Sequence, residues 1–329
     1  MTNVCWFAAL SAALAACLGL GAARAGEAAA EYGVQPINTG GKPAQWQQHL
    51  NDYWRLITLH DVRNQGRAAL LRDAPEALVK ELLPDGAFIL DVHAFLLQDL
   101  RDPENPDAPL VLFDTGNGTA KGGKLPDHFK ELGIDPARVT DVVITHMHGD
   151  HIGGLLDADG RPIYAKAALH ASVAEKAYWM GEDDANLTPN ANVKAFLAAY
   201  GDRVKLFADD AEIIPGVKAV PAFGHTPGHT GFLLRPPDRP NQAAETPTVF
   251  IWGDLLHCLP VQIRRPEINM AFDVDPARAA ATRRAMLERA AEEGWIVAGM
   301  HLPFPGYGKI RRGEKEGEAF IFVDASPNK

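Results

Sequence analysis

The stretch Thr145-His146-Met147-His148-Gly149-Asp150-His151 places three imidazoles and one carboxylate within seven residues. It directly follows the apolar run Val142-Val143-Ile144, which predicts a buried strand. Imidazole nitrogens and carboxylate oxygens are the ligands that zinc and similar divalent metals take in proteins. The stretch therefore predicts a metal site where a strand ends in a glycine-containing loop.

The composition and length are those of a globular protein of the size of many enzymes. The chain has 329 residues, of which 47% are hydrophobic, so it can bury a large core without disulfides. No repeat or low-complexity linker interrupts residues 49–329, which we expect to form a single catalytic domain. The formal net charge of -10 argues against a nucleic acid or an anionic membrane as partner, because both favour a basic surface.

The first 25 residues resemble an export signal. A mostly apolar run from Val4 to Leu20 precedes Ala23-Arg24-Ala25, which fits the small-residue rule for signal-peptide cleavage. We therefore expect a protein exported to the periplasm or secreted, although the sequence carries no basic residue before Val4. The alternative is a lipoprotein anchored through Cys17, since Leu14-Ala15-Ala16-Cys17 resembles a lipoprotein box. Neither alternative needs a transmembrane span, because the apolar run is too short for one.

Two further expectations concern the mature chain. Residues 26–48 are rich in glycine, alanine, proline and polar residues without a clear period, so a loose mature N-terminus is expected there. Of the three cysteines Cys5, Cys17 and Cys258, only Cys258 would remain after cleavage near Ala25. An intramolecular disulfide is then excluded, and stability must come from packing and bound metal.

The order of apolar runs predicts an α/β fold. A strand at 110–113, an amphipathic helix at 125–132 and the strand at 142–144 follow one another within about forty residues, which is an α/β signal. Expected strands lie at 54–59, 88–97, 110–113, 142–144, near Ile163, and at 204–207, 217–222, 231–234, 249–252, 295–299 and 319–323. Expected helices lie around 75–83, at 125–132, around 177–179, at 193–200, and from Pro276 to about Glu293 after the N-cap Asp275.

Three more metal ligands are predicted after later strands. His229, Asp254 and His301 each lie in or beside a glycine-containing loop that follows an apolar run. The strand ends of a layered α/β fold gather at one edge, so these residues are expected to meet the first cluster. The seven donors exceed what one tetrahedral zinc ion can use. They favour two ions, about 3.5–4 Å from each other, that share one carboxylate.

The spacing His146-x-His148-x-Asp150-His151, followed in order by His229, Asp254 and His301, resembles the metallo-β-lactamase-fold hydrolases. The resemblance implies a four-layer αββα sandwich. It also implies that His146, His148 and His229 hold one ion, that Asp150, His151 and His301 hold the other, and that Asp254 bridges the two. The neighbouring His225 is not a ligand in this interpretation.

The residues around these ligands narrow the resemblance. The segments 225–230 and 301–306 resemble those of the methyl parathion hydrolase group and its lactonase relatives. That likeness suggests pocket walls at Trp179 and Phe196, although aromatic residues at helical spacing also fit a core, and it places Phe304 beside the pocket. His257 stands where those relatives have an aliphatic wall, and the loop at 117–121 lacks an expected aromatic residue. Both departures weaken the case for an organophosphate substrate.

The implied activity is hydrolysis of a lactone, an aryl ester or a phosphotriester by a metal-bridging hydroxide. Asp150 is the expected catalytic residue, because it can both bind the second ion and orient the hydroxide. Asp114 is expected to orient a ligand imidazole or to cap its own glycine loop. The expected cofactors are two divalent ions, zinc first, although manganese, iron and cobalt suit the same donors. The expected partner is a small apolar ester-type molecule, and a homodimer is compatible with the sequence.

Two other functions remain open at this level. The first is another reaction on the same metals, such as thioester hydrolysis of the glyoxalase II type or iron-dependent oxygenation. The second is a non-catalytic metal-dependent binding protein. Because a binding protein has no need for an open hydroxide position, the complete donor set argues against the second.

Overall fold

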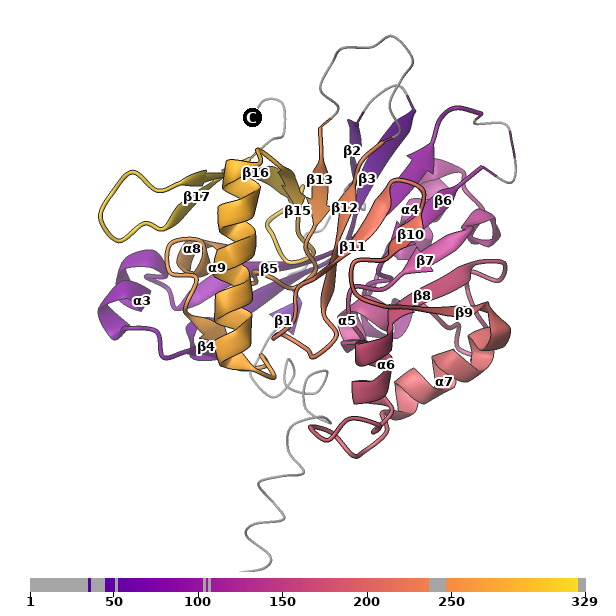
Figure 1. Cartoon of the computed structure of the whole chain (residues 1–329), viewed down its shortest axis with the longest axis horizontal. Helices are drawn as coiled ribbons and strands as arrows, with labels where there is room; N and C mark the ends of the chain where they lie inside the picture. The colour runs from indigo at the N-terminus through magenta and orange to yellow at the C-terminus, as the bar shows by residue number, and fades with distance from the viewer. Residues whose placement is uncertain are drawn as a thin grey trace, which may run out of the picture.

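Two β-sheets stacked face to face form the centre of the molecule (Figure 1). The structure is a computed structural model that describes residues 35–36, 45–50, 53–102, 105, 108–236 and 247–324. Within these residues the first sheet has eight strands and the second has seven. The predicted signal peptide at 1–25 lies outside the described residues.

The first sheet is built from the first half of the chain. Its strand order is β1-β3-β5-β6-β7-β8-β9, and β2 also pairs with β3. The long strands β3 and β5 pair antiparallel, whereas β6, β7, β8 and β9 run parallel. The bounds are β1 Gln35–Pro36, β2 Gln45–His49, β3 Trp54–Arg67, β5 Ala87–Asp99, β6 Leu110–Phe113, β7 Asp141–Val143, β8 Ala168–Ser172 and β9 Val204–Phe207.

The second sheet is built from the second half, in the order β10-β11-β12-β13-β15-β16-β17. Only the pair β13 and β15 is parallel. The bounds are β10 Glu212–Ile214, β11 Val217–Pro221, β12 Thr230–Leu234, β13 Val249–Ile251, β15 Ile296–Ala298, β16 Tyr307–Arg312 and β17 Phe320–Asp324. A separate short ribbon pairs β4 (Leu71–Arg72) with β14 (Asn269–Met270).

Side chains that alternate along the strands explain the layers. In β6, Val111 and Phe113 point into the core between the sheets, while Leu112 packs against the outer helices. In β12, Phe232 and Leu234 point into the same central core, and Leu233 packs on the opposite outer face. All of these side chains are buried, as expected for strands covered on both faces.

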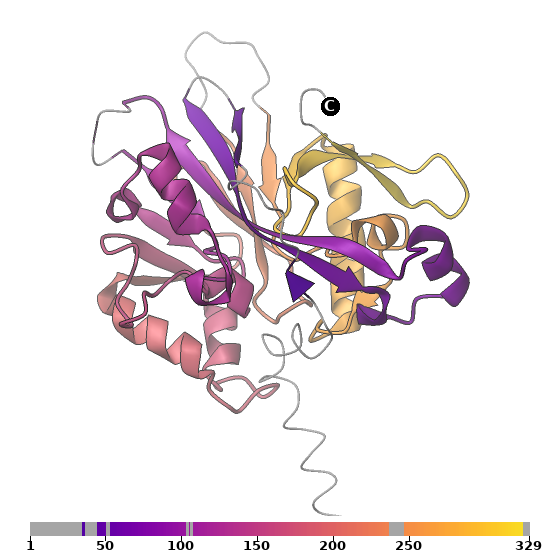
Figure 2. The same ribbon diagram turned by 180° about the vertical axis from the view of Figure 1, so that it is seen from behind.

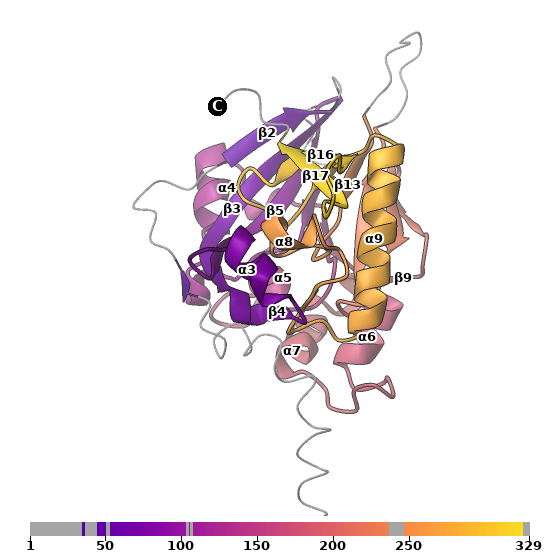
Figure 3. The same ribbon diagram turned by 90° about the vertical axis from the view of Figure 1, so that its left-hand side faces the viewer.

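Helices cover the outer face of each sheet. The first sheet is covered by α4 (Leu125–Leu132), α6 (Val173–Trp179) and α7 (Ala191–Tyr200), and the second by α9 (Pro276–Glu292) (Figures 1 and 2). The short helices α3 (Glu76–Leu82) and α8 (Leu259–Gln262) pack together beside β4 (Figure 3). The expected αββα sandwich is therefore confirmed.

Several elements differ from the sequence-based expectations, including the short strands β4, β10 and β14, which were not expected. No strand forms near Ile163 in the described chain; the neighbouring strand is β8, which begins at Ala168. The strand β16 was not expected, since Tyr307–Arg312 alternates polar and charged residues with few apolar ones. Within the expected loose segment 26–48, β1 and most of β2 pair with β3, although residues 37–44 lie outside the described chain.

In the part of the chain that the structure describes, no helix is long and apolar enough to cross a membrane.

Candidate metal centre

The ends of four strands bring the chemically important side chains together. The short helix α5 (Gly149–Ile152) and His146 follow β7 in the first sheet. In the second sheet β11 and β13 are both antiparallel to β12, and β15 is parallel to β13, so all three end at the same edge. The loops after these three strands carry His225, Asp254 and His301.

The first donor group consists of His146, His148, His225 and Asp254. His148 Nδ1 lies 2.9 Å from both His146 Nε2 and His225 Nε2. Asp254 Oδ2 lies 3.4 Å from His146 Nε2 and 3.2 Å from His225 Nε2. Ligand atoms that are held tetrahedrally at about 2.0–2.1 Å from zinc are about 3.3 Å apart. These four residues therefore have the spacing that one tetrahedral ion requires.

The second donor group consists of Asp150, His151 and His301, and it shares Asp254 with the first. His151 Nε2 lies 3.1 Å from Asp254 Oδ1, and His301 Nε2 lies 3.2 Å from Asp254 Oδ2. Asp150 oxygens lie 3.7 Å from His151 Nε2 and 3.5 Å from His301 Nε2. The Asp150 side chain is 33% exposed, whereas those of His151, His301 and Asp254 are at most 3% exposed. Solvent thus reaches the centre on the Asp150 side.

Buried polar atoms in the centre fit a bound cation. His151 Nε2 and Asp254 Oδ1 are buried and make no hydrogen bond with the described residues. Leaving such atoms unsatisfied is costly in a protein interior, so a bound group is expected to satisfy them. Nitrogen and carboxylate oxygen donors suit zinc and similar divalent ions. The residues present therefore fit the metal site that the sequence predicted.

Carboxylates raise the pKa values of some donor imidazoles, whereas burial and neighbouring imidazoles lower those of His146 and His148 well below the ordinary value. Burial lowers the pKa of His151, but the carboxylates of Asp254, Asp150 and Asp114 outweigh it and raise that pKa well above its ordinary value. Burial also opposes protonation of His225, yet hydrogen bonds with Asp254 and with Asp273 raise its pKa to about 9. Although burial alone would raise the pKa of Asp254, the surrounding imidazoles hold it well below the ordinary value. The carboxylates thus create a potential that stabilises a cation.

The structure places His225, and not His229, in the first group, which corrects the ligand set expected from the resemblance. Both ring nitrogens of His229 are already used: Nδ1–H donates to Ala222 O at 2.7 Å, and Nε2 accepts from Asp254 N–H at 2.9 Å. A Cβ atom added to Gly253 would lie 2.4 Å from His229 Nε2, so this ring nitrogen is packed closely against the backbone before Asp254. His229 instead supports the backbone at Asp254.

Four of the donor histidines have a hydrogen-bond partner at Nδ1, which for His146 is the Thr145 hydroxyl at 3.1 Å. His151 Nδ1–H donates to Asp114 Oδ2 at 2.7 Å, and His225 Nδ1–H donates to Asp273 Oδ1 at 2.8 Å. His301 Nδ1–H donates to the backbone carbonyl of Asp91 at 2.7 Å. Such contacts hold the Nδ1 proton of each ring and would leave Nε2 available to a bound ion.

Asp114 lies directly after β6 in a left-handed backbone conformation with a φ of 58°. Besides binding His151, its carboxylate accepts hydrogen bonds from the Thr145 N–H at 2.8 Å and from the Thr145 hydroxyl at 2.7 Å. Asp114 therefore fixes both the start of the ligand stretch and the orientation of His151.

The expected pocket aromatics have different surroundings. Trp179 lies edge-on to His148, with ring centroids 5.4 Å apart, so it does border the centre. Phe196 is buried in the core that α7 forms with the first sheet. The Phe304 ring lies 5.6 Å from that of His60 and 6.1 Å from that of His93, in the loop that carries His301.

His257 was expected to line the pocket, and it lies inside the centre itself. Its Nε2 atom is 3.0 Å from Asp254 Oδ2, and its ring stacks on that of His301 with centroids 4.8 Å apart. With Asp254 and His301 it forms a third set of close donors. Burial lowers the pKa of His257 to about 4, so the ring is neutral near pH 7.

Sequence reasoning missed three carboxylates that support the ligands. Asp273 orients His225, and Asp91 accepts from the Phe304 N–H at 2.8 Å as well as through its own backbone from His301. Glu175 accepts hydrogen bonds from the ligand stretch and from the loop after His225. No local pattern marks these residues, since each is a single acid within a helix, strand or loop.

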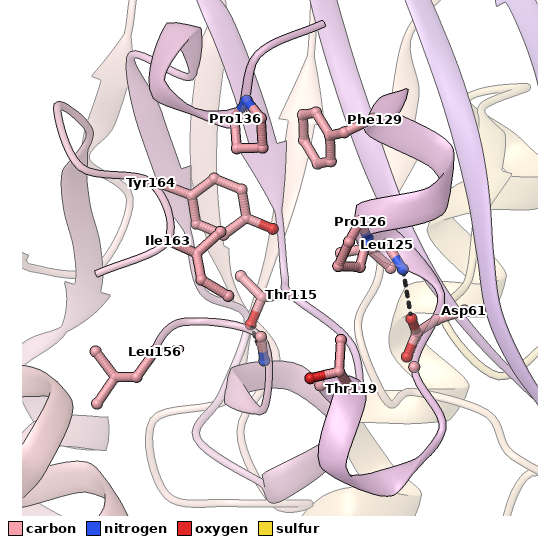
Figure 4. A pocket seen from close by; sticks show the side chains of 13 residues that line it. Asp61, Thr115, Thr119, Leu125, Pro126, Phe129, Pro136, Leu156, Ile163 and Tyr164 are labelled. Atoms are coloured by element: carbon pink, nitrogen blue, oxygen red, sulfur yellow. Dashed lines mark hydrogen bonds between the residues drawn. The ribbon is translucent and has the colours of Figure 1, made fainter. Parts of the chain in front are cut away.

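A small cavity of about 40 Å³ is lined in part by the loop that follows β6 (Figure 4). Its lining is mainly apolar and includes Leu125, Phe129 and Tyr164, with the buried Asp61 at one end. Asp61 accepts three backbone N–H groups of this loop, from Asn117, Lys124 and Leu125. None of the metal donors or the expected pocket residues lines this cavity.

Comparison with known protein families agrees with this architecture. Residues 91–240 match the model of the metallo-beta-lactamase superfamily. That span includes the ligand stretch at 145–151 and His225. The chain therefore contains a metallo-beta-lactamase superfamily domain.

Among known proteins, the chain is similar to an N-acyl homoserine lactonase of a Bacillus species, at 26% identity over 175 residues. The match covers 46% of this chain and 62% of that lactonase. The solved structure of AbOPH, a hydrolase in the beta-lactamase superfamily, superposes with a TM-score of 0.75 at 25% identity, covering 88% of this chain and all of that one. AidC, a dizinc quorum-quenching lactonase, superposes with a TM-score of 0.72 at 20% identity, covering 87% and 99% of the two chains.

Proposed function

We propose that this protein is a dinuclear metal-dependent hydrolase that opens lactones or cleaves aryl esters or phosphotriesters. The observation that carries the proposal is the position of Asp254. Its Oδ2 atom lies within 3.4 Å of donors from both groups, and its Oδ1 atom lies 3.1 Å from His151. A shared carboxylate between two sets of nitrogen ligands is the arrangement that a two-metal hydrolase requires.

In this proposal His146, His148 and His225 hold one ion, Asp150, His151 and His301 hold the other, and Asp254 serves both. When bound, the ions would supply Lewis acidity and a water whose pKa is lowered to about 7. The similar N-acyl homoserine lactonase and AidC make a lactone the first substrate to test. Zinc is the first metal to test, because AidC is a dizinc enzyme and the donors suit zinc.

The chain itself would orient the reactants. Substrate would enter on the Asp150 side, since that donor is the most exposed of its group. Asp150 would accept the proton of the nucleophilic water and pass it to the leaving oxygen. Trp179, whose ring lies edge-on to His148, would form an apolar wall for the substrate.

The test combines metal content with hydrolysis. Purified protein is stripped with a chelator, reloaded separately with zinc, manganese, iron or cobalt, and assayed on lactones, aryl esters, phosphotriesters and thioesters. The proposal expects two ions per chain and hydrolysis of at least one oxygen ester. One ion in a fully active chain would exclude the dinuclear arrangement. Activity on thioesters alone would favour a glyoxalase II type enzyme, and two bound ions without any hydrolysis would favour a binding protein.

We also propose that the protein is exported, because the apolar run at 4–20 precedes a small-residue cleavage site. Cell fractionation and N-terminal sequencing of the mature protein test this. A mature chain that begins near Gly26 fits a secretory signal, and one that begins at an acylated Cys17 fits a lipoprotein.

A further inference from the structure

Glu175, in the first turn of α6, is a buried carboxylate that accepts four hydrogen bonds. Its Oε1 atom accepts from the Met147 N–H at 2.8 Å and from the Trp179 indole N–H at 2.6 Å. Its Oε2 atom accepts from the Thr226 hydroxyl at 2.7 Å and from the Gly228 N–H at 3.0 Å. Both oxygens are therefore fully used, although no metal donor contacts them.

These four donors come from the segments that build the first donor group. Met147 stands between His146 and His148, while Thr226 and Gly228 follow His225. The first segment follows β7 of the first sheet, and the second follows β11 of the second sheet. Glu175 thus joins two loops that otherwise belong to different layers of the sandwich.

The loop after His225 is packed directly against α6. A Cβ atom added to Gly228 would lie 2.1 Å from the backbone nitrogen of Glu175, so only glycine permits this approach. The N-cap of α6 is already supplied by Ser172, whose side chain accepts from the Ala174 N–H. Helix capping therefore does not explain the carboxylate.

Burying a carboxylate is costly unless its charge is satisfied by hydrogen bonds. Burial raises the pKa of Glu175, and the hydrogen bonds from Met147, Thr226, Trp179 and Gly228 oppose that rise. Hydrogen bonds to an ionised acceptor are about twice as strong as neutral ones, which lets one side chain hold several segments in place. An apolar side chain of similar size could fill the same space but could not fix the positions of the two loops.

We propose that Glu175 is the positioning residue of the first donor group: it holds His146 and His148 at the distance from His225 that one ion requires. The proposal rests on the metal-dependent function described above. Because Trp179 is bound to the same carboxylate oxygen as Met147, Glu175 also fixes the aromatic wall relative to His148. It does not contact the second donor group.

The decisive variant is Glu175→Gln, which keeps the shape of the side chain. Its NH₂ group would face N–H donors whichever way the amide is turned, because each oxygen of Glu175 accepts at least one N–H group. Replacing a residue that orients metal ligands typically costs 10–100-fold in metal affinity. We expect the affinity for the ion of the first donor group to fall at least 10-fold, and the affinity for the ion of the second group to stay unchanged.

Chelator competition with zinc, followed by counting the ions that remain bound, measures both affinities. The variant His225→Ala is the reference for losing the first ion, the one held by the first donor group. The variant His301→Ala is the reference for losing the second ion, held by the second group. The matched control is Glu182→Gln, because Glu182 lies just after α6, is exposed, and its carboxylate pairs with Lys176 alone among the described residues. It should bind both ions like the unmodified protein.

The outcomes separate the two proposals. If the unmodified protein binds no divalent ion, the proposed function fails. If it binds two ions and Glu175→Gln binds both with unchanged affinity, the inference about Glu175 alone is overturned. An equal loss for both ions also overturns it, because a purely structural role would weaken both groups together. Should Glu175→Gln not fold, Thr226→Val removes one of the four hydrogen bonds, and a selective loss of a few fold for the first ion is then the expected result.

Discussion

The Nε2 atom of His225 lies 2.9 Å from the Nδ1 atom of His148, so a loop of the second sheet closes the donor group that begins in the first sheet. His229, four residues later, points its Nε2 atom at the Asp254 N–H instead. The two histidines of the same loop therefore have separate roles: one completes the metal donors, and the other supports the backbone.

The first prediction follows from this difference. His225→Ala should remove one nitrogen donor and leave about one ion per chain. His229→Gln should keep both ions but lower the thermal midpoint of unfolding, because it disturbs hydrogen bonds to Ala222 and Asp254. Metal content and thermal unfolding of the two purified variants test this pair. Loss of an ion from His229→Gln together with full metal in His225→Ala would restore the ligand set expected from the sequence.

A second prediction concerns Asp114, whose carboxylate accepts hydrogen bonds from His151 and from the backbone N–H and the hydroxyl of Thr145. Asp114→Asn would bring an NH₂ group against one of these donors, and His151 would lose its fixed orientation. We expect the affinity for the second ion to fall about 10–100-fold. Asp157→Asn is the control, since Asp157 is exposed in a loop and its carboxylate accepts from Asp159 and Arg161 instead of a metal donor. Equal affinities in the two variants would show that Asp114 only caps its own loop.

A third prediction separates chemistry from binding at Asp150. Asp150→Asn keeps an oxygen that can face the second ion but cannot accept a proton at neutral pH. We expect kcat for an ester or lactone to fall by about 10²–10⁴, with a much smaller change in KM. The comparison requires variants that are shown to carry two ions. Wild-type turnover in a fully loaded Asp150→Asn variant would exclude the proposed proton transfer.

The fourth prediction is a pH dependence of stability that arises at His93. Burial lowers the pKa of this imidazole to about 3, compared with an ordinary value of about 6.5. Between these values the unfolded chain binds a proton that the folded chain does not, so stability falls as the pH drops below about 6.5. His93→Gln removes this contribution and can still donate to Leu302 O, which the ring contacts at 2.8 Å.

We therefore expect the loss of unfolding free energy from pH 7.5 to pH 5 to be smaller in His93→Gln by about 2 kcal/mol. Urea unfolding in saturating zinc at both pH values measures it, because both proteins then share the same change in metal binding. An identical loss in the two proteins would mean that His93 already binds a proton in the folded state.

A fifth prediction concerns removal of the ions. Buried donors such as His151 Nε2 and Asp254 Oδ1 make no hydrogen bond with the described residues, so the folded chain should bind metal much more tightly than the unfolded chain. At a free zinc concentration about 1,000 times the dissociation constant, binding adds about 4 kcal/mol per site to stability. The thermal midpoint should drop on chelation and recover on adding zinc. A midpoint that does not respond to zinc would indicate that the donor groups do not bind it.

Much of the fold could be predicted because its signals are local. The apolar runs at 110–113 and 249–252 are short and bounded by glycine or turn residues, and both became central strands, β6 and β13. The helix at Pro276–Glu292 begins at its N-cap, where Asp275 accepts from the Arg278 N–H as its sequence suggests. The strand β16 escaped prediction because its position beside β15, and not its own composition, makes it a strand.

In the candidate site, too, some features have a local sequence signal and others depend on how the chain folds. The ligand stretch at 146–151 was evident because its donors are adjacent in sequence. The choice between His225 and His229 was not, since both are histidines in one glycine-containing loop and only the folded backbone decides which ring faces His148. Glu175 is a single acid on the short helix α6, and its importance depends on two loops that fold against it.

The division of the metal donors between two sheets has a consequence for how the protein is made. His146 and His148 emerge from the ribosome early, but His225, Asp254 and His301 belong to strands of the second sheet and are synthesised later. A nascent chain can therefore hold an ion only loosely, and tight capture must wait until both halves have been translated and packed together. If the donors bind metal as proposed, its uptake would come among the last steps of maturation, once both halves of the chain have folded.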